Sequence, residues 1–567
     1  MALNEYKPGT TFPGRMGRTI GESDPAWPAP LRPKKGAPNV LFIVLDDTGF
    51  GQLGCYGSPI HTPNLDKLAK HGVLYANMHT TALCSPSRSC MLTGRNHHSN
   101  AMSCITEGSE GYPGSNGMVP FENGFLSEIL LQHGYNTYAV GKWHLTPAEQ
   151  ISAAGPYDRW PLGRGFERYY GFLGGDTSQY YPDLVYDNHQ VEPPEKPEDG
   201  YHLTRGPGRQ GHQLHRRLVP TVLEALAIEA PTQIRGVTQS PIEGISFAPT
   251  FADPKAEDRH KTQYFEMFAH RALYHDGWRA VCPFPGTSFK EAKAFFGQLP
   301  LTEEKLRELD AKGWELYNLK EDPTETKNLA GTHRDKLIEM IALWYVEAGK
   351  YNVLPLDSRG TARFADVRPQ LTKERQIYVY YPDTQVVPEN VAVKVLNRAH
   401  SFTAEVEIPK DGAEGVIFCH GSNAGGYSLF VKDGKLHYVH NYVGAQEFHV
   451  ESTQEVPKGK CKLRFEFEPT GKPDVAKGKG APSRAELYFN GKLVGKGDIS
   501  VTVPLLLGLG GGLSVGHNPG SAVASIYEPP FAFTGRIFKV TADVSGKMIQ
   551  DTEAEANAHA KAAMARQ

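Results

Sequence analysis

The sequence is poor in cysteine, in long apolar runs and in net charge. Seven cysteines are scattered over 567 residues, and this odd, dispersed set does not fit a disulfide framework, so we expect a reducing, cytoplasmic compartment. No window approaches the roughly 20 apolar residues of a membrane span, and residues 1–38 lack the apolar core of a signal peptide. The net charge of −3 favours neither nucleic acid nor an anionic membrane as a partner.

What the sequence does contain, between residues 39 and 368, is the alternation of strands and helices that indicates an α/β domain. The run NVLFIVLDD is apolar and β-branched from residue 40 to residue 45, which predicts a strand buried on both faces of a mostly parallel central sheet. Functional groups are then expected where the strands end. Further strands are predicted at 73–80 and 135–144, and helices at 63–72, 125–134 and 219–231.

The rest of this domain has its own local signals. Residues 205–217 are rich in Gly, Arg and His, without apolar periodicity, and are expected to be a linker or a join. Residues 263–282 predict a β-meander with a turn at Asp276-Gly277. A strand near residues 314–319 and a helix over 333–351 follow.

After about residue 369 the pattern changes to short alternating runs separated by Asp-Gly and Asn-Gly turns, which is typical of an all-β sandwich over residues 369–550. The Pro- and Gly-rich residues 1–38 are expected to wrap the surface as an irregular arm. The Ala-rich residues 551–567 predict a helical tail. The sequence carries no signal of oligomeric state.

Chemically active side chains concentrate in residues 80–100, TTALCSPSRSCMLTGRNHHSN. Cys84 taken alone fits three interpretations: a thiol whose pKa is lowered by nearby Arg88, a metal ligand, or a small buried side chain. The neighbouring cysteines are expected to pack in the core, and the neighbouring histidines to line a site or to cap a loop: Cys90, Cys104, His97 and His98.

Three segments together carry a family resemblance. CSPSRSCMLTGR contains the sulfatase signature, in which a Cys is followed by x-Pro-Ser-Arg and then by Thr-Gly-Arg, with LDDTGFG upstream and GKWH downstream. From residue 39 to about residue 350 the chain therefore resembles a long bacterial-type arylsulfatase, and its sandwich resembles the extra domain of a long arylsulfatase subfamily. The resemblance implies an alkaline-phosphatase-like α/β fold and the hydrolysis of a small sulfuric ester.

In this family a separate maturation enzyme oxidises the signature cysteine to formylglycine. The resemblance thus implies that Cys84 becomes a hydrated aldehyde and that a formylglycine-generating enzyme is a partner of this chain. One hydroxyl of the diol would attack sulfur, and the other would help to expel the bound sulfate. A plain alcohol nucleophile would instead leave a stable sulfate ester behind.

The resemblance also assigns a metal and its ligands. Asp46 and Asp47, together with the converted Cys84, match the ligands of one calcium ion, and carboxylate oxygens suit a hard divalent cation that also acts as a Lewis acid. Without the resemblance, an Asp-Asp pair after a strand is more often a helix cap or a solvated turn.

Three cations or donors complete the site that the resemblance implies. Arg88 is expected to hold the diol, Lys142 to bind a sulfate oxygen and His144 to contact the diol. Lys142 and His144 are two residues apart, so on a strand they project to the same side. Taken alone, both fit ordinary surface positions equally well.

The family normally completes its site from a long middle portion, which supplies a further His, an Asp-Asn pair and a second Lys. None of these can be matched here, so a central segment is missing near residues 205–217; Asp187-Asn188 is interpreted as a strand-end pair. Two alternatives therefore stay open: a pseudo-sulfatase that binds a glycan or a protein through its sandwich, and a phosphate- or phosphonate-ester hydrolase. Tyr427, Tyr438 and Tyr442 are candidates for such a binding surface or, more often, for strand packing.

Overall fold

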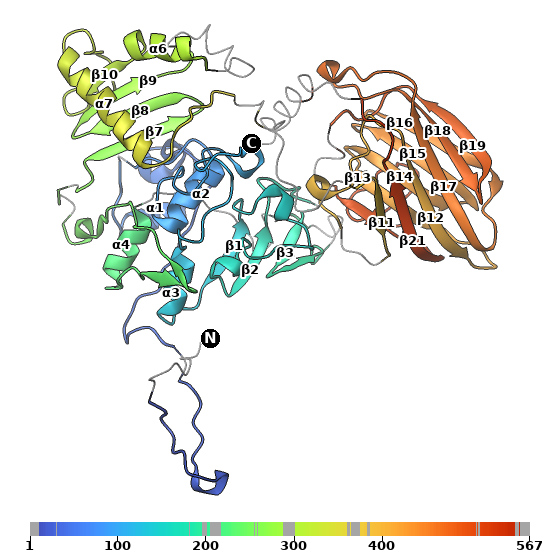
Figure 1. Cartoon of the computed structure of the whole chain (residues 1–567), viewed down its shortest axis with the longest axis horizontal. Coiled ribbons are helices and arrows are strands. Elements are labelled where there is room, and N and C mark those ends of the chain that lie inside the picture. Colours follow the sequence, from blue (N-terminus) through green and yellow to red (C-terminus); the bar gives the residue numbers. More distant parts are fainter. Residues whose placement is uncertain are drawn as a thin grey trace.

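The protein is described here from a computed structural model. It describes residues 11–29, 31–76, 78–180, 182–195, 201–203, 217–253, 256–257, 259–286, 301–359, 363, 375–382, 386–505, 507, 511–549 and 555. A mixed α/β region and an antiparallel β-sandwich lie side by side (Figure 1), which confirms the predicted combination of an α/β region with an all-β sandwich. The prediction of a mostly parallel central sheet is wrong for the described residues, because only one strand pair of the α/β region is parallel. Among the described helices, none combines the length and the apolarity that crossing a bilayer requires.

The first part of the α/β region places four short helices around a small sheet: α1 (Pro63–Ala69), α2 (Cys84–Thr93), α3 (Leu126–Gln132) and α4 (Leu218–Ala225). The sheet has the order β1-β2-β3-β4, formed by β1 (Tyr138–Lys142), β2 (Arg168–Phe172), β3 (Leu184–Tyr186) and β4 (His189–Val191). β1 and β2 are parallel, whereas β3 and β4 join as antiparallel strands. Asp187 and Asn188 form the β3–β4 turn, as predicted. A two-stranded hairpin follows α4, β5 (Gln233–Ile234) with β6 (Val237–Thr238).

The second part is an antiparallel sheet covered by a long helix. The predicted meander is confirmed as β7 (Thr262–Met267), β8 (His270–His275) and β9 (Trp278–Cys282), and β10 (Glu315–Asn318) joins β9. Asp276 and Gly277 both have positive φ at the tight β8–β9 turn, a conformation that Gly adopts without steric cost. Two helices belong to this layer, α6 (Glu303–Lys312) and α7 (Arg334–Lys350).

Helix α7 packs on this sheet because its apolar side chains recur at helical spacing. Leu337, Met340 and Trp344 are buried and share one cluster with Leu273 and Leu316 of the sheet. The exposed side of the helix carries charged side chains such as Glu339 together with the apolar Ile338 and Val346, which are 52% and 62% exposed. The helix predicted over residues 333–351 is thus confirmed as α7.

The sandwich pairs a six-stranded sheet with a five-stranded one. The first has the order β11-β21-β12-β17-β18-β19 and the second β16-β15-β14-β13-β20. Their bounds are β11 (Ile377–Tyr380), β12 (His400–Ile408), β13 (Gly415–Ser422), β14 (Gly425–Lys432), β15 (Lys435–Tyr442), β16 (Gln446–Glu455), β17 (Gly459–Pro469), β18 (Ser483–Phe489), β19 (Lys492–Ile499), β20 (Leu513–Val515) and β21 (Arg536–Asp543).

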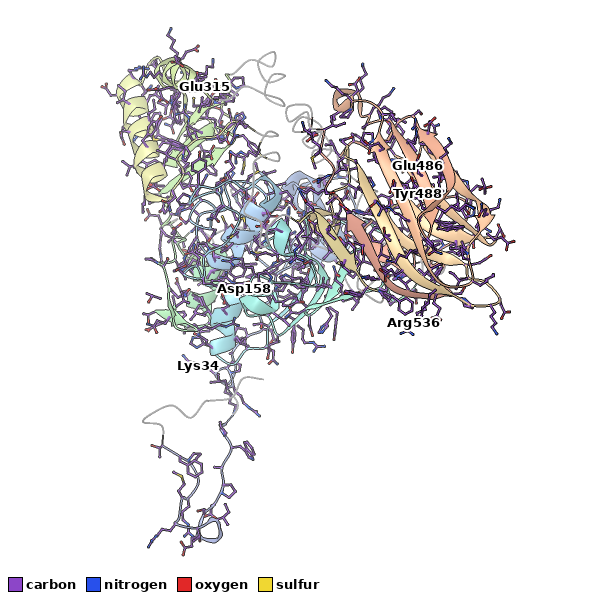
Figure 2. All side chains as sticks on the ribbon, turned by 45° about the vertical axis from the view of Figure 1, so that its right-hand side comes forward. Lys34, Asp158, Glu315, Glu486, Tyr488 and Arg536 are labelled. Carbon is purple, nitrogen blue, oxygen red and sulfur yellow. The ribbon has the colours of Figure 1, made fainter. Side chains whose placement is uncertain are left out.

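Along a strand, successive side chains point to opposite faces of the sheet, as β18 illustrates. In β18, Ala485 and Leu487 are fully buried between the sheets, whereas Glu486 and Tyr488 lie on the outer face, where the tyrosine hydroxyl donates to the carboxylate (Figure 2). Tyr427 and Tyr438 are buried inside the sandwich and Tyr442 packs against its core. The proposal of an aromatic binding surface is therefore wrong for Tyr427 and Tyr438, where the alternative of strand packing holds, whereas Tyr442 is only partly buried.

Two predicted strands are absent. Residues 40–45 form no ladder, and Leu41 and Ile43 are 79% and 55% exposed while Phe42 and Val44 pack inward. Residues 73–76 and 78–80 are likewise not strands. A strand buried on both faces needs a hydrogen-bonded neighbour on each side, and the described residues supply none to residues 40–45.

Two expectations concern the ends of the chain. Residues 11–29 project away from the body instead of wrapping it (Figure 1), and Ile20 and Trp27 are both 89% exposed, so that prediction is wrong. The helical tail predicted at 551–567 lies outside the described residues except for Glu555, and the linker at 205–217 lies outside them except for Arg217.

Candidate active site

Cys84 is the first residue of helix α2, a helix that the sequence analysis did not predict. The helix runs to Thr93 and ends at Gly94, which has φ 71° and lies so close to Val219 and Ile242 that a side chain would collide with them. Every residue of the helix after Cys84 is buried. The helix therefore fixes the cysteine at the edge of a packed region, with the positive end of the helix dipole beside its side chain.

A chain of two contacts leads from Cys84 to a partly buried carboxylate. The Cys84 Sγ lies 3.1 Å from Nδ1 of His144, and Nε2 of His144 lies 2.8 Å from Oε2 of Glu107. His144 follows β1 and has φ 56°, and Gly175 makes room for its ring, since a Cβ there would lie 2.6 Å from Cε1. The imidazole of His144 thus lies between the Glu107 carboxylate and the Cys84 thiol and contacts both.

The charges of these three groups support one another. Burial alone would raise the pKa of the Cys84 thiol, but the charge and hydrogen bond of His144, with Lys142 behind them, lower it to about 7. Burial would lower the pKa of His144, yet Glu107 and Cys84 raise it to about 9. Burial would raise the pKa of Glu107, and His144 instead lowers it to about 2. At neutral pH the site therefore favours an imidazolium between two anionic groups.

A second set of charges surrounds Asp46. The Lys142 Nζ lies 2.8 Å and the Arg88 Nη2 3.6 Å from the Asp46 carboxylate, and Arg88 also donates to the backbone carbonyl of Lys142 over 2.6 Å. Both cationic side chains are 7% exposed. These contacts bring three parts of the chain together: the last residue of β1, the second turn of α2 and Asp46, which directly follows residues 40–45.

These residues do not assemble a calcium site. The Asp46 carboxylate already lies beside Lys142 and Arg88, and Asp47 is exposed. Within the described part of the chain, three metal-ligating atoms lie within 4.8 Å of one another only in the sandwich, so Asp46, Asp47 and Cys84 do not form such a group. Because Ca²⁺ takes about 6–8 oxygen ligands, the side chains present do not fit the ion that the resemblance implies, and no chemical step below uses it.

The structure thus brings together Cys84, Arg88, Lys142, His144 and Asp46, and leaves Asp47 at the rim. Glu107, in the 3₁₀ turn Thr106–Gly108, is a candidate that the sequence analysis missed. It stands in the Gly- and Ser-rich run ITEGSEG, where neither spacing nor periodicity distinguishes it from a solvated loop residue.

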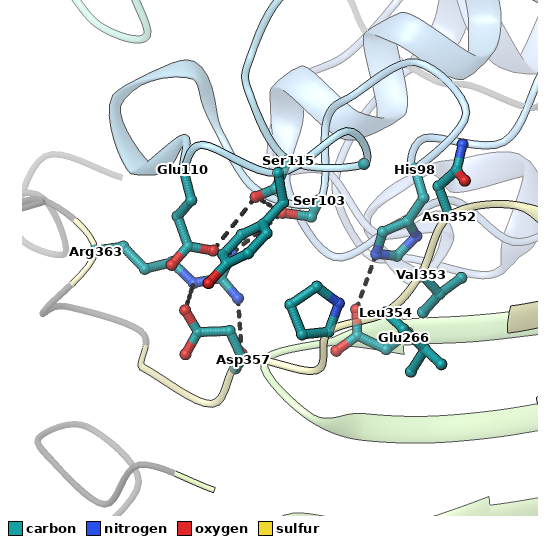
Figure 3. A pocket seen from close by; sticks show the side chains of 13 residues that line it. His98, Ser103, Glu110, Ser115, Glu266, Asn352, Val353, Leu354, Asp357 and Arg363 are labelled. Carbon is teal, nitrogen blue, oxygen red and sulfur yellow. Dashed lines mark hydrogen bonds and ion pairs between the residues drawn. The ribbon is translucent and has the colours of Figure 1, made fainter. Parts of the chain in front are cut away.

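The histidines next to the signature lie elsewhere. His97 contacts the backbone carbonyl of Met102 through Nδ1, and His98 contacts Glu266 through Nε2 at 3.0 Å. His98 and Glu266 line a small hollow between the signature loop and β7, shown in Figure 3. Burial lowers the pKa of His98 to about 3, so the ring is neutral there. Cys90 and Cys104 are buried free thiols, which confirms their predicted packing role.

The other side of the same hollow is an ionic cluster (Figure 3). Arg363 lies 3.5 Å from Glu110 and 3.3 Å from Asp357, and Arg359 contacts both carboxylates. Burial and the neighbouring Asp357 raise the pKa of Glu110. The cluster joins the loop after α2 to the chain that follows α7.

Comparisons with known proteins agree with the signature. Residues 38–233 match the sulfatase family model, so this segment of the chain is similar to sulfatases. Over 156 residues it is 39% identical to an uncharacterised sulfatase of Schizosaccharomyces pombe (26% of each chain), and over 142 residues 41% identical to human arylsulfatase D (24% of this chain, 23% of that one).

The chain is also 39% identical to mouse steryl-sulfatase over 153 residues, which cover 26% of this chain and 24% of that one. The chain thus spans about a quarter of the length of the curated relatives it matches. The crystal structure of a putative sulfatase from Bacteroides fragilis aligns with 57% of this chain and 97% of its own, at 16% identity and a TM-score of 0.34.

Proposed function

We propose that this protein hydrolyses a sulfuric ester, in the manner of an arylsulfatase, at the site around Cys84. One observation carries the proposal: the family-matched segment gathers a helix-terminal cysteine, an imidazole and two buried cations from two separate parts of the chain. The sulfate ester is anionic, and negative charge develops on its bridging oxygen as the S–O bond breaks. Lys142 and Arg88 provide positive charge in a site largely closed to water, where such stabilisation is strongest.

The side chain of residue 84 is the proposed nucleophile. When Cys84 is converted to formylglycine, the hydrated group supplies a hydroxyl nucleophile and a second hydroxyl that allows the bound sulfate to leave. The surrounding donors fit an oxygen at this position, because His144 Nδ1 already points at the cysteine sulfur and Lys142 acts on its charge. His144 holds a proton at Nδ1, and Glu107 accepts from Nε2 and stabilises the charged ring.

The first experiment is the hydrolysis of 4-nitrophenyl sulfate. The full chain is co-expressed with a formylglycine-generating enzyme, its conversion at residue 84 is measured by mass spectrometry, and 4-nitrophenyl phosphate is compared under the same conditions. Cys84→Ala should abolish turnover, whereas Cys55→Ala, at a free cysteine in another segment, should not. Faster release from the phosphate ester would instead indicate the phosphohydrolase alternative. A folded, fully converted protein that hydrolyses neither ester would be a pseudo-sulfatase.

Glu107 is proposed as a positioning residue that acts through His144. Glu107→Gln keeps the size of the side chain but removes its charge, so we expect kcat to fall by at most about 10²–10⁴-fold, the range for loss of a general acid–base group, with little change in KM. The alkaline limb of the pH–kcat profile should also move to lower pH, because the pKa of His144 then loses its main support.

Two further variants separate positioning from folding. Glu107→Asp should recover part of kcat, and Glu122→Gln, at an exposed glutamate, should leave both kcat and the profile unchanged. A Glu107→Gln enzyme with an unaltered pH profile and full kcat would exclude the role.

A further inference from the structure

A cluster of metal-ligating side chains lies in the sandwich, far along the chain from Cys84. It consists of His437 on β15 with His449 and Glu451 on β16. In the antiparallel register His437 is opposite Glu451, and His449 is opposite Val439, two residues further along β15. All three side chains therefore project from the same face of the five-stranded sheet. That face is the outer one, because Leu436, Tyr438 and Val450 fill the space between the sheets.

The ring of His437 is held in one orientation and one tautomer. Its plane stacks on Phe430 with a centroid distance of 5.1 Å and an angle of 8°, and its Nε2 lies 3.0 Å from the backbone carbonyl of Lys432. Since a carbonyl only accepts, Nε2 donates the hydrogen and Nδ1 carries the lone pair. A histidine that donates one ring N–H to a carbonyl and keeps a lone pair on its other nitrogen has the usual arrangement of a metal-ligating histidine.

The remaining two ligands complete a small, accessible donor set. Nδ1 of His437 lies 2.8 Å from Nε2 of His449, and one ligand atom from each of the three residues falls within 4.8 Å of the others. His449 and Glu451 are exposed, so an ion can reach them from solvent. Lys435 Nζ, 3.0 Å from Glu451 Oε1, is the nearest competing cation, and this exposed pair is weak enough for a divalent ion to replace it.

We propose that His437, His449 and Glu451 bind a divalent transition-metal ion, with Zn²⁺ as the ion they suit best. Two imidazole nitrogens and one carboxylate oxygen are ligands for a borderline ion, not for Ca²⁺ or Mg²⁺, which prefer oxygen alone. Three protein ligands leave a coordination position for water or for a donor group of a partner. The proposal is independent of the function assigned to Cys84.

The proposed site lies at the edge of the five-stranded sheet, where a bound ion would link two strands. β16 is the outer strand of the five-stranded sheet and pairs only with β15 in that sheet's order. The ion would join these two strands through side chains, in addition to their backbone hydrogen bonds. Binding to the folded sheet but not to the unfolded chain then stabilises this edge by mass action.

The test uses the full chain, freed of metal with a chelator and titrated with Zn²⁺ by calorimetry, with the visible absorption of Co²⁺ as a second readout. His449→Ala and Glu451→Gln should each weaken one Zn²⁺ site by at least about tenfold and remove the Co²⁺ absorption of a low-coordinate site. Glu455→Gln is the matched control, since it is an exposed glutamate on the same strand outside the cluster.

Hydrogen exchange provides the local readout, with slower exchange expected in β15 and β16 when Zn²⁺ is added to the wild type and no such change in His449→Ala. Equal Zn²⁺ isotherms for the wild type and His449→Ala would overturn the proposal and leave a plain hydrogen-bonded histidine pair. So would Zn²⁺ binding that protects only segments outside the sandwich.

Discussion

The sandwich and the region around Cys84 differ in how they bury apolar side chains. In the sandwich, side chains from both sheets form one large cluster that includes Phe402, Phe418 and Phe465. Around Cys84 the buried apolar side chains divide into separate small clusters, one beside Trp143 and Trp160, one between α3 and α4, and one between β2 and β3.

The two regions also differ at their sheet surfaces. In the six-stranded sheet, β17 and β18 alternate between buried and more exposed positions, whereas β13, β14 and β15 of the other sheet are buried along almost their whole length. On β1, at the edge of its sheet in the described residues, Tyr138 and Val140 are 62% and 55% exposed, and the neighbouring segment 40–45 exposes Leu41 and Ile43 in the same alternating way. Both segments, β1 and residues 40–45, have the apolar side chains of strands that are buried on both faces. No described residue covers their exposed face.

The difference indicates where stability and function are located. Apolar burial between two sheets stabilises the sandwich without help from charge. The site instead depends on buried ionic contacts, Lys142 with Asp46 and His144 with Glu107, which hold three chain segments together. Substitutions in the sandwich core should therefore act on stability, and substitutions at the site should act on rate.

The largest expected effect is on the sandwich core. Phe402 is fully buried, with the rings of Phe418, Tyr427 and Phe465 at 4.8, 5.1 and 5.5 Å. Phe402→Ala should lower the free energy of unfolding of the sandwich by about 3–5 kcal/mol, because the cavity adds to the lost apolar transfer. Urea unfolding followed by far-UV circular dichroism measures this change.

Tryptophan fluorescence supplies the internal comparison. All six tryptophans precede residue 350, and five of them lie in the α/β region and none in the sandwich, so changes in their emission on unfolding follow the α/β region. We expect Phe402→Ala to leave the fluorescence transition in place, and Leu493→Ala, at a side chain that is 44% exposed, to move neither signal. A common shift of both transitions would mean that the regions unfold as one unit and that the contrast drawn above fails.

The effect expected from pH is smaller for each residue, and its sign at His144 is opposite to its sign in the sandwich. Burial lowers the pKa values of His400, His420 and His440 to about 4, 3 and 3. Their contribution to stability is therefore complete above pH 6.5 and is lost as the pH falls toward 3–4, because the unfolded chain takes up protons first. When the pH is lowered from 8 to 5, each of these histidines should reduce the free energy of unfolding of the sandwich by on the order of 2 kcal/mol.

His144 titrates in the other direction. Its pKa, raised to about 9 by Glu107 and Cys84 against the effect of burial, gives a contribution that is complete below pH 6.5 and is lost as the pH rises through 9. Hydrogen exchange at pH 5, 7 and 9, corrected for intrinsic rates, should show protection of the sandwich rising with pH and protection around residues 138–144 falling above neutrality. Parallel changes in both regions would contradict the assignment.

Local patterns predicted the sandwich and the meander because the forces that make them are local. Alternation and Asp-Gly or Asn-Gly turns are enough to fix neighbouring antiparallel strands, as at β14–β15 and β18–β19. The run 40–45 carried an equally strong strand signal and is not a strand, since a ladder depends on a neighbour that its own sequence does not contain. Helix α2 was missed because its polar sequence, CSPSRSCMLT, has no apolar stripe, although every side chain after Cys84 is buried.

The same reasoning applies to the site. The signature motif predicted Cys84, Arg88, Lys142 and His144 as partners, and the structure places them together, but their catalytic roles remain predictions. The two-residue spacing of Lys142 and His144 predicted that both side chains project from one face of a strand. In the structure β1 ends at Lys142, so His144 is not on the strand. The positive φ of His144 directs its ring to Cys84 instead. Glu107 belongs to the site through a tertiary contact only, so no pattern within its own segment could have identified it.

The smallest effect is expected on the exposed face of β1. Val140→Thr keeps the β-branched shape that a strand favours and replaces one exposed methyl group by a hydroxyl, so the free energy of unfolding should change by no more than about 0.5 kcal/mol. Exposed apolar side chains on an edge strand promote association between chains, and Val140→Thr should therefore reduce concentration-dependent self-association in sedimentation velocity. A stability loss well above that limit would show that Val140 is covered in the folded protein, and the two regions would then bury their apolar strands in the same way.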